Sequence, residues 1–356
     1  MHQTQPYKAV AKKVAVVIPS NVTGGHEFQS RALADDFARL AQTTVYLNHE
    51  GQRQLFEDST AQIFVQPDLF FEAGWMGRQV FNGIRRAFII RRLLSNYDKI
   101  VVCGGAVEAG ICTSVALAGR RNVSLYLPSF FDRTVLWGRF GYLYNLILGC
   151  FGVFYTNIIT INRIQAKLIH GFMHRPTLVV PNLVGDVPLA REGVAGRLLY
   201  IGRLDRQKRV PEIMEWLDFD QNPYREMLII GDGPDRDAIA TKTVGLKHVK
   251  ATLLGWKSRA EQNDLIGAKD VLLLNSMIEG EPLVIREANK RGVLVMARDI
   301  PGVRGVTFKR NRFQSKESFR AVLIDAGLGR LRKKVEGEKN DVSKKRLNAT
   351  IVFLAR

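Results

Sequence analysis

The sequence contains little cysteine, fewer acidic than basic residues, and no uninterrupted apolar run of the roughly 20 residues that a membrane-spanning helix needs. Only three of its 356 residues are cysteine, and their spacing suggests neither a zinc site nor a disulfide framework. The polar start MHQTQPYKAVAKK shows no signal peptide. We therefore expect a protein of the reducing cytoplasm.

The shortage of acidic residues leaves a large positive charge. Lys and Arg number 52 against 34 Asp and Glu, so the net charge is +18. Hydrophobic residues make up 46% and charged residues 24%, which is typical of a globular protein and argues against a disordered or fibrous chain. A charge of this size implies an anionic partner, either nucleic acid or an acidic membrane surface.

The positive charge is concentrated in two segments. Residues 73–144 have a net charge of +7 and residues 301–356 a net charge of +10. Residues 201–300 are balanced, with 16 basic and 16 acidic residues. We therefore expect the excess positive charge to lie on surfaces formed by residues 73–144 and 301–356, and not on the part of the protein formed by residues 201–300.

Short β-branched runs alternate with helical patterns, which predicts parallel α/β layers. The expected strands are 13–19, 44–47, 62–65, 99–102, 124–127, 157–161, 177–180, 198–201, 226–230, 250–254, 271–274 and 293–297. A looser stretch at 182–197 indicates a linker. We expect an N-terminal Rossmann-like domain at 1–185 and a C-terminal one at 193–339, although one large α/β domain is compatible with the length.

Two segments of the first half are open to two interpretations. Residues 134–155 are mostly apolar but are interrupted by Arg139 and Asn145, which favours a core or interface helix over a membrane-inserted one. Residues 76–94 predict a helix in which arginines alternate with large apolar side chains. Such a helix suits an anionic bilayer, or it packs its apolar side on the sheet with its arginines in water.

The second half contains the segments that suggest chemistry. Arg203 and Lys208 follow a buried strand at its carboxyl end, where α/β sheets bind ligands, and together they can reach a diphosphate. A solvated basic loop is an equal alternative for this segment alone. Gly231 and Gly233 permit a tight turn near a ligand, although Gly-Asp-Gly-Pro is also ordinary turn chemistry.

The most informative segment is VLLLNSMIEGEPLVIREA at 271–288. It reads as a strand, a loop containing Glu279, and a helix that begins at Pro282. The free amides at the start of that helix, on Leu283 and Val284, form an anion site. Glu279 and Glu287 can accept hydrogen bonds from sugar and ribose hydroxyls.

The ordered set of these motifs resembles the donor half of retaining GT-B glycosyltransferases of the GT4 class (glycosyltransferase family 4, group 1), similar to bacterial enzymes that build lipopolysaccharide and surface glycans. The set comprises Gly202-Arg203 with Lys208, Gly231 to Pro234, Gly255-Trp256, and Glu279-x7-Glu287 followed by Ala288 and Gly292. The resemblance is close over 198–300 and looser in the first half. It implies a GT-B fold, with two Rossmann-like domains facing a cleft and a last helix, 340–356, packed on the N-terminal domain.

The resemblance also implies roles for individual residues. A nucleotide-diphosphate sugar is the implied donor, and no metal or other cofactor is needed. Arg203 and Lys208 neutralise the leaving diphosphate, Glu279 holds the sugar and Glu287 the ribose. The implied backbone contacts to the donor come from Gly24, Gly25, Gly202, Gly233 and Gly280, with the amides of Leu283 and Val284.

Several residues depart from the family pattern. Glu281 stands where an aromatic residue or glycine is usual, which leaves the shape of the sugar pocket open; we count it among the donor-binding candidates. Leu294 replaces a proline, and no histidine follows the strand at 124–127. His26 is a candidate contact to donor or acceptor, although a lone histidine in a loop is more often a bystander.

The basic helix supplies the expected membrane contact. Arg85, Arg86, Arg91 and Arg92 are the candidate docking residues, so we expect a peripheral protein on the inner face of the cytoplasmic membrane that extends a glycan or a lipid-linked acceptor with a hexose-type sugar. A nucleotide-sugar 2-epimerase of the same fold is one alternative. A basic nucleic-acid-binding protein is another, but no nucleic-acid motif supports it.

Overall fold

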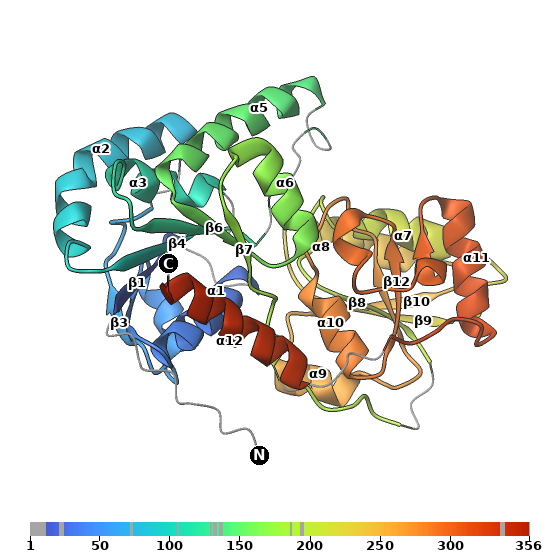
Figure 1. Ribbon diagram of the computed structural model, residues 1–356. Coiled ribbons are helices and arrows are strands. Elements are labelled where there is room, and N and C mark those ends of the chain that lie inside the picture. Colours follow the sequence, from blue (N-terminus) through green and yellow to red (C-terminus); the bar gives the residue numbers. More distant parts are fainter. Residues whose placement is uncertain are drawn as a thin grey trace, which may run out of the picture. The chain divides into compact units, whose positions relative to one another are not determined.

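The structure, a computed structural model (Figure 1), describes residues 12–20, 25–71, 74–104, 107–128, 130, 134, 138–185, 187–192, 196–334 and 339–355. The chain divides into two units. Unit 1 comprises Met1–Leu183 and Lys339–Arg356, and unit 2 comprises Val184–Glu338. Each unit has its own parallel sheet and its own hydrophobic cores.

Seven parallel strands form the sheet of unit 1, in the order β3-β2-β1-β4-β5-β6-β7. They are β1 (Lys13–Ile18), β2 (Gln42–Leu47), β3 (Gln62–Val65), β4 (Lys99–Cys103), β5 (Val123–Tyr126), β6 (Asn157–Thr160) and β7 (Thr177–Val179). The central strands are rich in Val and Ile because both of their faces are covered.

Helices cover both faces of this sheet (Figure 1). They are α1 (Gly25–Ala38), α2 (Met76–Leu93), α3 (Val107–Ala116), α5 (Arg139–Cys150), α6 (Arg163–Met173) and α12 (Lys339–Ala355), with 3₁₀ turns η1 (Glu50–Phe56) and η2 (Phe151–Phe154). The side chains of β1 alternate between two cores. Val14, Val16 and Ile18 face the core closed by α1 and α12, whereas Ala15 and Val17 face the core closed by α2, α3, α5 and α6.

The last helix, α12, is held on unit 1 by apolar and polar contacts. The Phe353 ring lies 5.2 Å from that of Phe37 on α1. Arg346, which is only 2% exposed, donates from Nε to Asp36 Oδ2 at 2.8 Å and from Nη1 to the Pro181 carbonyl at 2.6 Å. A buried guanidinium with these acceptors fixes the position of α12 on α1.

Six parallel strands form the sheet of unit 2, in the order β10-β9-β8-β11-β12-β13. They are β8 (Leu198–Ile201), β9 (Glu226–Ile230), β10 (Lys250–Gly255), β11 (Val271–Leu274), β12 (Leu294–Arg298) and β13 (Arg312–Phe313). The helices are α7 (Val210–Leu217), α8 (Arg236–Gly245), α9 (Arg259–Leu265), α10 (Leu283–Lys290) and α11 (Lys316–Gly327), with 3₁₀ turns η3 (Pro301–Val303) and η4 (Lys309–Asn311).

The strand order of unit 2 reverses between β8 and β11. From β8 the chain adds β9 and β10 on one side, and then β11, β12 and β13 on the other. A parallel α/β sheet opens a crevice at the carboxyl ends of the strands at such a reversal, and ligands bind there. The loops that follow β8 and β11 are therefore where a ligand site is expected.

Helix α2 packs only part of its apolar side on the core of unit 1, through Ile90 and Leu93, and leaves other large apolar side chains exposed. Its buried residues are Gln79, Asn82, Gly83 and Ile90. A Cβ on Gly83 would lie 2.6 Å from the Cys112 carbonyl oxygen, so α2 and α3 approach too closely there for a side chain. The outward-facing apolar side chains on and before α2 are Trp75, Phe81, Ile84, Phe88 and Ile89.

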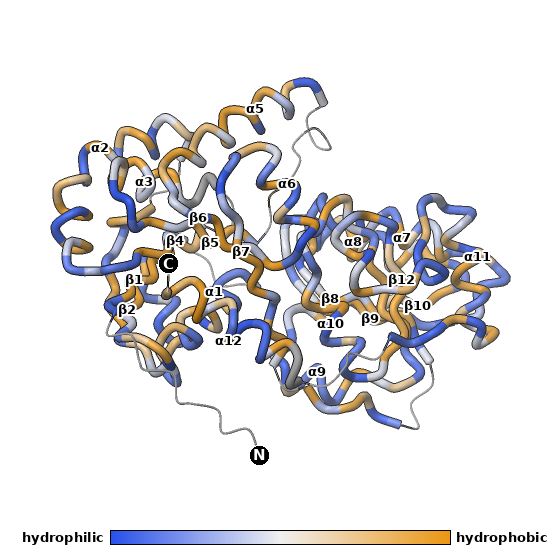
Figure 2. The backbone as a smooth tube through the Cα atoms, viewed as in Figure 1, coloured by the Kyte–Doolittle hydropathy of each residue, from blue (hydrophilic) through white to orange (hydrophobic). Residues whose placement is uncertain are grey.

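Helix α5 lies within the apolar run at 134–155 and is a core helix on one side only. Gly141, Asn145, Leu148 and Gly149 are buried. The other side exposes Phe140, Tyr142, Leu143, Leu146 and Ile147. Figure 2 shows α5 as a largely hydrophobic segment. We refer to these exposed side chains of α5, together with those of α2, as the outer apolar face; both helices lie on the same side of the sheet of unit 1.

Candidate active site

The loops after β8 and β11 are joined to each other by hydrogen bonds. Gln207 Nε2 donates to the Ile278 carbonyl at 2.9 Å, and the Met277 amide donates to the Gln207 carbonyl at 2.8 Å. These contacts join segments 71 residues apart in the sequence at the point where the strand order reverses. The sequence motifs around Lys208 and Glu279 therefore belong to one site.

Lys208 and Glu279 form an ion pair in this site. Lys208 Nζ lies 2.5 Å from Glu279 Oε1, and the two side chains are only 19% and 11% exposed. Ser276 Oγ donates to the same carboxylate oxygen at 2.6 Å. The structure thus brings together a cation that suits phosphate and a carboxylate that suits hydroxyl donors.

Arg203 lies in the same loop but is much more exposed. Its side chain is 70% exposed, and its Nε donates to Asp205 Oδ2 at 2.6 Å. The backbone of Arg203 is held in place by the buried Tyr200, whose hydroxyl donates to the Arg203 carbonyl at 2.7 Å. Burial raises the pKa of Tyr200, so its hydroxyl stays protonated and remains a donor.

The glycines of the turn after β9 allow the loops to lie close together. At Gly231, where φ is +150°, a Cβ would lie 1.8 Å from the Gly202 carbonyl oxygen. At Gly233, where φ is +154°, it would lie 2.3 Å from the Leu204 carbonyl oxygen. Gly202, Gly231 and Gly233 are thus positions where the loop backbones approach each other, and Gly231 and Gly233 form the tight turn that the sequence predicted.

The start of α10 borders the same loops. Helix α10 begins with Leu283 and Val284, and Pro282 before it makes no capping hydrogen bond with its side chain. The amides of Leu283 and Val284, like those at the start of any helix, have no acceptor within the helix. The backbone at Gly280 lies against η3: a Cβ on Gly302 would lie 2.1 Å from the Glu279 carbonyl oxygen and 3.0 Å from that of Gly280.

Glu281, the residue that departs from the family pattern, forms an ion pair within the same helix start. Its Oε1 lies 2.8 Å from Arg286 Nη1, and the two side chains are 13% and 11% exposed. When an ion pair is largely removed from water, the attraction between its charges offsets the free energy of desolvation only if their geometry is good. Glu281 is therefore a fixed part of the loop and not a side chain in open solvent.

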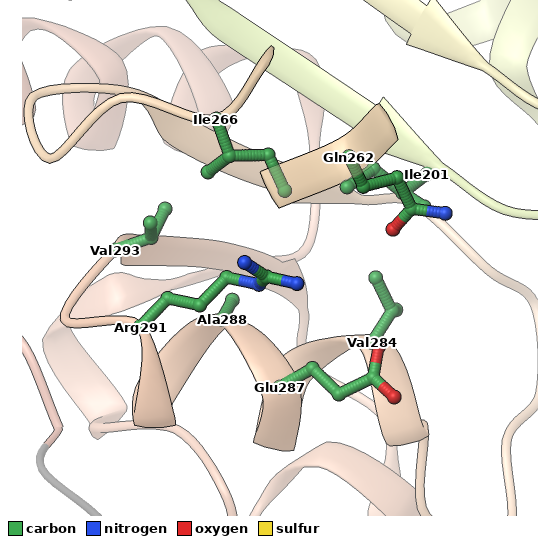
Figure 3. Close-up of a pocket in the computed structure, with 8 residues that line it drawn as sticks. All are labelled: Ile201, Gln262, Ile266, Val284, Glu287, Ala288, Arg291 and Val293. Atoms are coloured by element: carbon green, nitrogen blue, oxygen red, sulfur yellow. The ribbon is translucent and has the colours of Figure 1, made fainter. Parts of the chain in front are cut away.

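Glu287 lies one to two turns along α10, beside a small pocket (Figure 3). Its Oε1 lies 2.8 Å from Arg259 Nη2 on α9. The pocket walls are mostly aliphatic, from Ile201, Ile266 and Val284, and Arg291 points into it from the last turn of the helix. The pocket and Glu287 belong to unit 2 alone.

A polar network beside the Lys208 loop, centred on Asn275, was not predicted from the sequence. Asn275 Nδ2 donates to the Arg209 carbonyl at 3.1 Å and to Glu212 Oε2 at 2.7 Å, and Asn275 Oδ1 accepts from Arg298 Nε at 3.0 Å. Arg209 itself has φ +52°, a left-handed conformation that is unfavourable for a side chain of its size. Burial lowers the pKa of Arg298. The only sequence signal was the polar Asn275 at the end of an apolar strand.

The candidate residues of unit 1 are only partly described. Gly25 is the first residue of α1, whereas Gly24 lies outside the described residues. His26 lies in the first turn of α1, with Nε2 3.0 Å from the Cys103 carbonyl oxygen and its ring stacked on Tyr126. Burial lowers the pKa of His26, which favours a neutral ring packed in the core.

The four arginines of α2 divide into two kinds. Arg86 donates to the carbonyls of Asp68 and Leu69, and Arg91 Nε donates to the Ala116 carbonyl at 2.8 Å. These two side chains tie α2 to neighbouring loops. Arg85 and Arg92 are exposed beside the outer apolar face.

Within the described ranges no group of three or more His, Cys, Asp and Glu residues is arranged to hold a metal ion. Of the helices that the structure describes, none combines the length and the apolar character needed to cross a bilayer.

The fold and the site together define a class of protein. Two parallel α/β units and a last helix returned to the first unit are the architecture of GT-B glycosyltransferases. The chain is similar to the lipopolysaccharide outer core galactosyltransferase WaaB, with a TM-score of 0.68, 16% identity and coverage of 96% of this chain and 99% of that one. It is also similar to HepE of Anabaena, solved with UDP and glucose, with a TM-score of 0.63, 14% identity and coverage of 97% and 100%.

The sequence comparison matches part of the chain to a family. Residues 192–312 match the family described as glycosyl transferases group 1, so the chain contains a domain of this family within unit 2. A segment of 128 residues is 28% identical to TuaC of Bacillus subtilis (strain 168), described as a teichuronic acid biosynthesis glycosyltransferase. The match covers 36% of this chain and only 31% of TuaC. The predicted GT-B fold and the resemblance of the second half to group 1 glycosyltransferases are thereby confirmed.

Proposed function

We propose that the protein is a retaining glycosyltransferase that moves a hexose-type sugar from a nucleotide-diphosphate sugar to a glycan or lipid-linked acceptor. It works without a metal or other cofactor, as a peripheral protein on the inner face of the cytoplasmic membrane, in the synthesis of lipopolysaccharide or another surface polysaccharide. The observation that most supports this is the meeting of Lys208 and Glu279 where the strand order of unit 2 reverses.

The proposed chemistry depends on stabilising the leaving group. Negative charge develops on the diphosphate as the glycosidic bond breaks, and cations already in place lower the barrier most. Lys208 and Arg203 supply that charge, and the amides of Leu283 and Val284 add hydrogen bonds at the start of α10. Binding of the diphosphate draws Lys208 from Glu279, which leaves that carboxylate to accept from the sugar hydroxyls.

Glu287 is proposed to accept hydrogen bonds from the ribose hydroxyls. Its contact with Arg259 orients the carboxylate. HepE, a protein of the same fold, was solved with UDP and glucose, which supports a nucleotide-sugar donor. TuaC, WaaB and WaaG are described as enzymes of teichuronic acid or lipopolysaccharide synthesis, which supports a surface-glycan acceptor.

The outer apolar face supports the membrane part of the proposal. Exposed apolar patches of this kind mark interaction sites, and Phe81, Phe88 and Phe140 are 63%, 75% and 83% exposed. Arg85 and Arg92 flank them with charge that attracts anionic lipid headgroups. In this arrangement the apolar side chains enter the headgroup region, and Arg86 and Arg91 maintain the position of α2.

The donor site is tested by substitutions at Lys208 and Glu287. K208A and E287A should each reduce the rate of sugar transfer about 100-fold or more, because each removes a charged contact made to the donor. The matched control is K242A, which removes an exposed Lys from another Lys–Glu pair of unit 2, that with Glu215. Transfer by either site variant at the rate of K242A would refute the donor-site assignment.

A further inference from the structure

The pocket beside Glu287 contains a buried cation with an unsatisfied hydrogen-bond donor. Arg291 is only 3% exposed, and its Nη1 has no hydrogen-bond acceptor among the described residues. Figure 3 shows its guanidinium extended back along α10 into the pocket. Burial lowers the pKa of this guanidinium, and the charge of the nearby Glu287 carboxylate opposes that effect only in part.

The other polar side chains of the pocket have partners. Gln262 Nε2 donates to the Lys257 carbonyl at 2.9 Å, and Glu287 lies 2.8 Å from Arg259. The buried Arg197 elsewhere in unit 2 lies 3.0 Å from Asp270. A buried, unpaired guanidinium is costly, so a fold that retains one is expected to have a use for it.

The pocket therefore requires a ligand group that accepts hydrogen bonds. Two guanidinium groups, of Arg259 and Arg291, stand near one carboxylate, that of Glu287. Arginine donates hydrogen bonds and cannot accept them. The aliphatic walls formed by Ile201 and Val284 suit the face of a flat ring better than a fully hydrated ion.

We propose that Arg291 is a specificity-determining residue that donates a hydrogen bond to a keto oxygen of the donor's nucleobase. The inference rests on the proposed function, in which Glu287, one helical turn before Arg291, binds the ribose. The base is attached to the ribose carbon next to the one that bears the 2′-hydroxyl, so it is the part of the donor nearest to the pocket. A donor-only side chain selects the keto bases uracil and guanine over adenine, whose corresponding group is an amine.

Nucleotide binding by Arg291 variants tests this directly. The affinities for UDP, GDP and ADP are measured by isothermal titration calorimetry for the full-length wild type, R291L and R291K. We expect R291L to weaken binding of the preferred keto nucleotide about 10- to 100-fold, the usual range for a hydrogen bond to a charged group, and to change ADP binding little. R291K, which keeps a donor, should recover part of the loss. Equal losses for all three nucleotides, or no loss, would overturn the proposal.

Thermal unfolding without nucleotide separates a ligand role from a structural one. R291L should unfold at the same temperature as the wild type or higher, because it removes an unpaired buried charge. The control R197L should unfold at a lower temperature, because it leaves Asp270 buried without its partner. A decrease in the unfolding temperature of R291L as large as that of R197L would overturn the proposal.

Two further results have distinct meanings. If inorganic phosphate alone stabilises the wild type but not R291L, the pocket is a site for free anions, and the assignment to the base is wrong. If the wild type binds none of the three nucleotides, the proposed glycosyltransferase function itself fails. Wild-type binding that R291L leaves unchanged refutes only the role of Arg291.

Discussion

At the scale of single residues, the site is organised by pairs of opposite charge that a ligand can exchange. Lys208 with Glu279 and Arg259 with Glu287 are such pairs, each partly or mostly buried. The sequence predicted Lys208, Glu279 and Glu287 as candidate site residues, but it did not predict which charged residues form pairs. The pairing depends on which strands are neighbours, and β8 and β11 are separated by two other strands along the chain.

Arg209 shows that the loop before α7 is held in a conformation its sequence does not favour. The residue follows Lys208 and adopts φ +52°, where a side chain costs about 1–2 kcal/mol. Asn275 compensates by donating to the Arg209 carbonyl, and the Arg209 guanidinium pairs with Glu212. Strain of this kind is found where a neighbouring residue must be positioned for function.

A comparison of R209G with R209A measures that strain. Both variants lose the ion pair with Glu212, but only glycine adopts a positive φ without a steric cost. We expect the free energy of unfolding of R209G to exceed that of R209A by about 0.5–1 kcal/mol, measured by urea denaturation. Equal stabilities would show that the left-handed conformation is not maintained in solution.

At the scale of elements, the strands were predictable and the outward sides of two helices were not. The ranges expected for β3, β8, β9 and β11 agree with the structure residue by residue, because each is a short apolar or β-branched run bounded by turn or polar residues. β13 was missed because it has only two residues, Arg312 and Phe313. The outward side of α2 depends on its packing against α3 at Gly83, a contact that no local pattern encodes.

The proposed membrane binding involves the outer apolar face of α2 and α5, and variants of α2 test it. R85Q/R92Q should reduce sedimentation with anionic vesicles, by about tenfold or more, since each arginine near such a surface contributes about 1 kcal/mol. F81S/F88S should reduce it as well, by removing apolar side chains from the headgroup region.

The control for this prediction is R39Q/R53Q. It removes two exposed arginines, Arg39 just after α1 and Arg53 in η1, on the opposite face of the same sheet. If the control lost as much binding as R85Q/R92Q, the effect would come from net charge alone and the docking surface would lie elsewhere. Unchanged sedimentation of both α2 variants would also contradict the proposal.

At the scale of the whole molecule, the charge and the chemistry occupy different parts of the sequence. The excess positive charge lies at 73–144 and 301–356, whereas residues 201–300, which contain the proposed donor residues Arg203, Lys208, Glu279 and Glu287, are balanced. The C-terminal segment 301–356 belongs partly to each unit, since α12 packs on α1. We interpret the charge as the means by which a surface-glycan enzyme reaches an anionic membrane, and the balanced segment as its donor site.

The central claim, a nucleotide-sugar donor bound through Lys208 and Glu287, is tested most directly by saturation-transfer NMR with a panel of UDP-, GDP- and ADP-sugars. The proposed function predicts saturation of the ribose and sugar protons of at least one nucleotide sugar in the wild type, and loss of that saturation in E287A. Absence of saturation for every nucleotide sugar, or equal saturation in E287A, would contradict it.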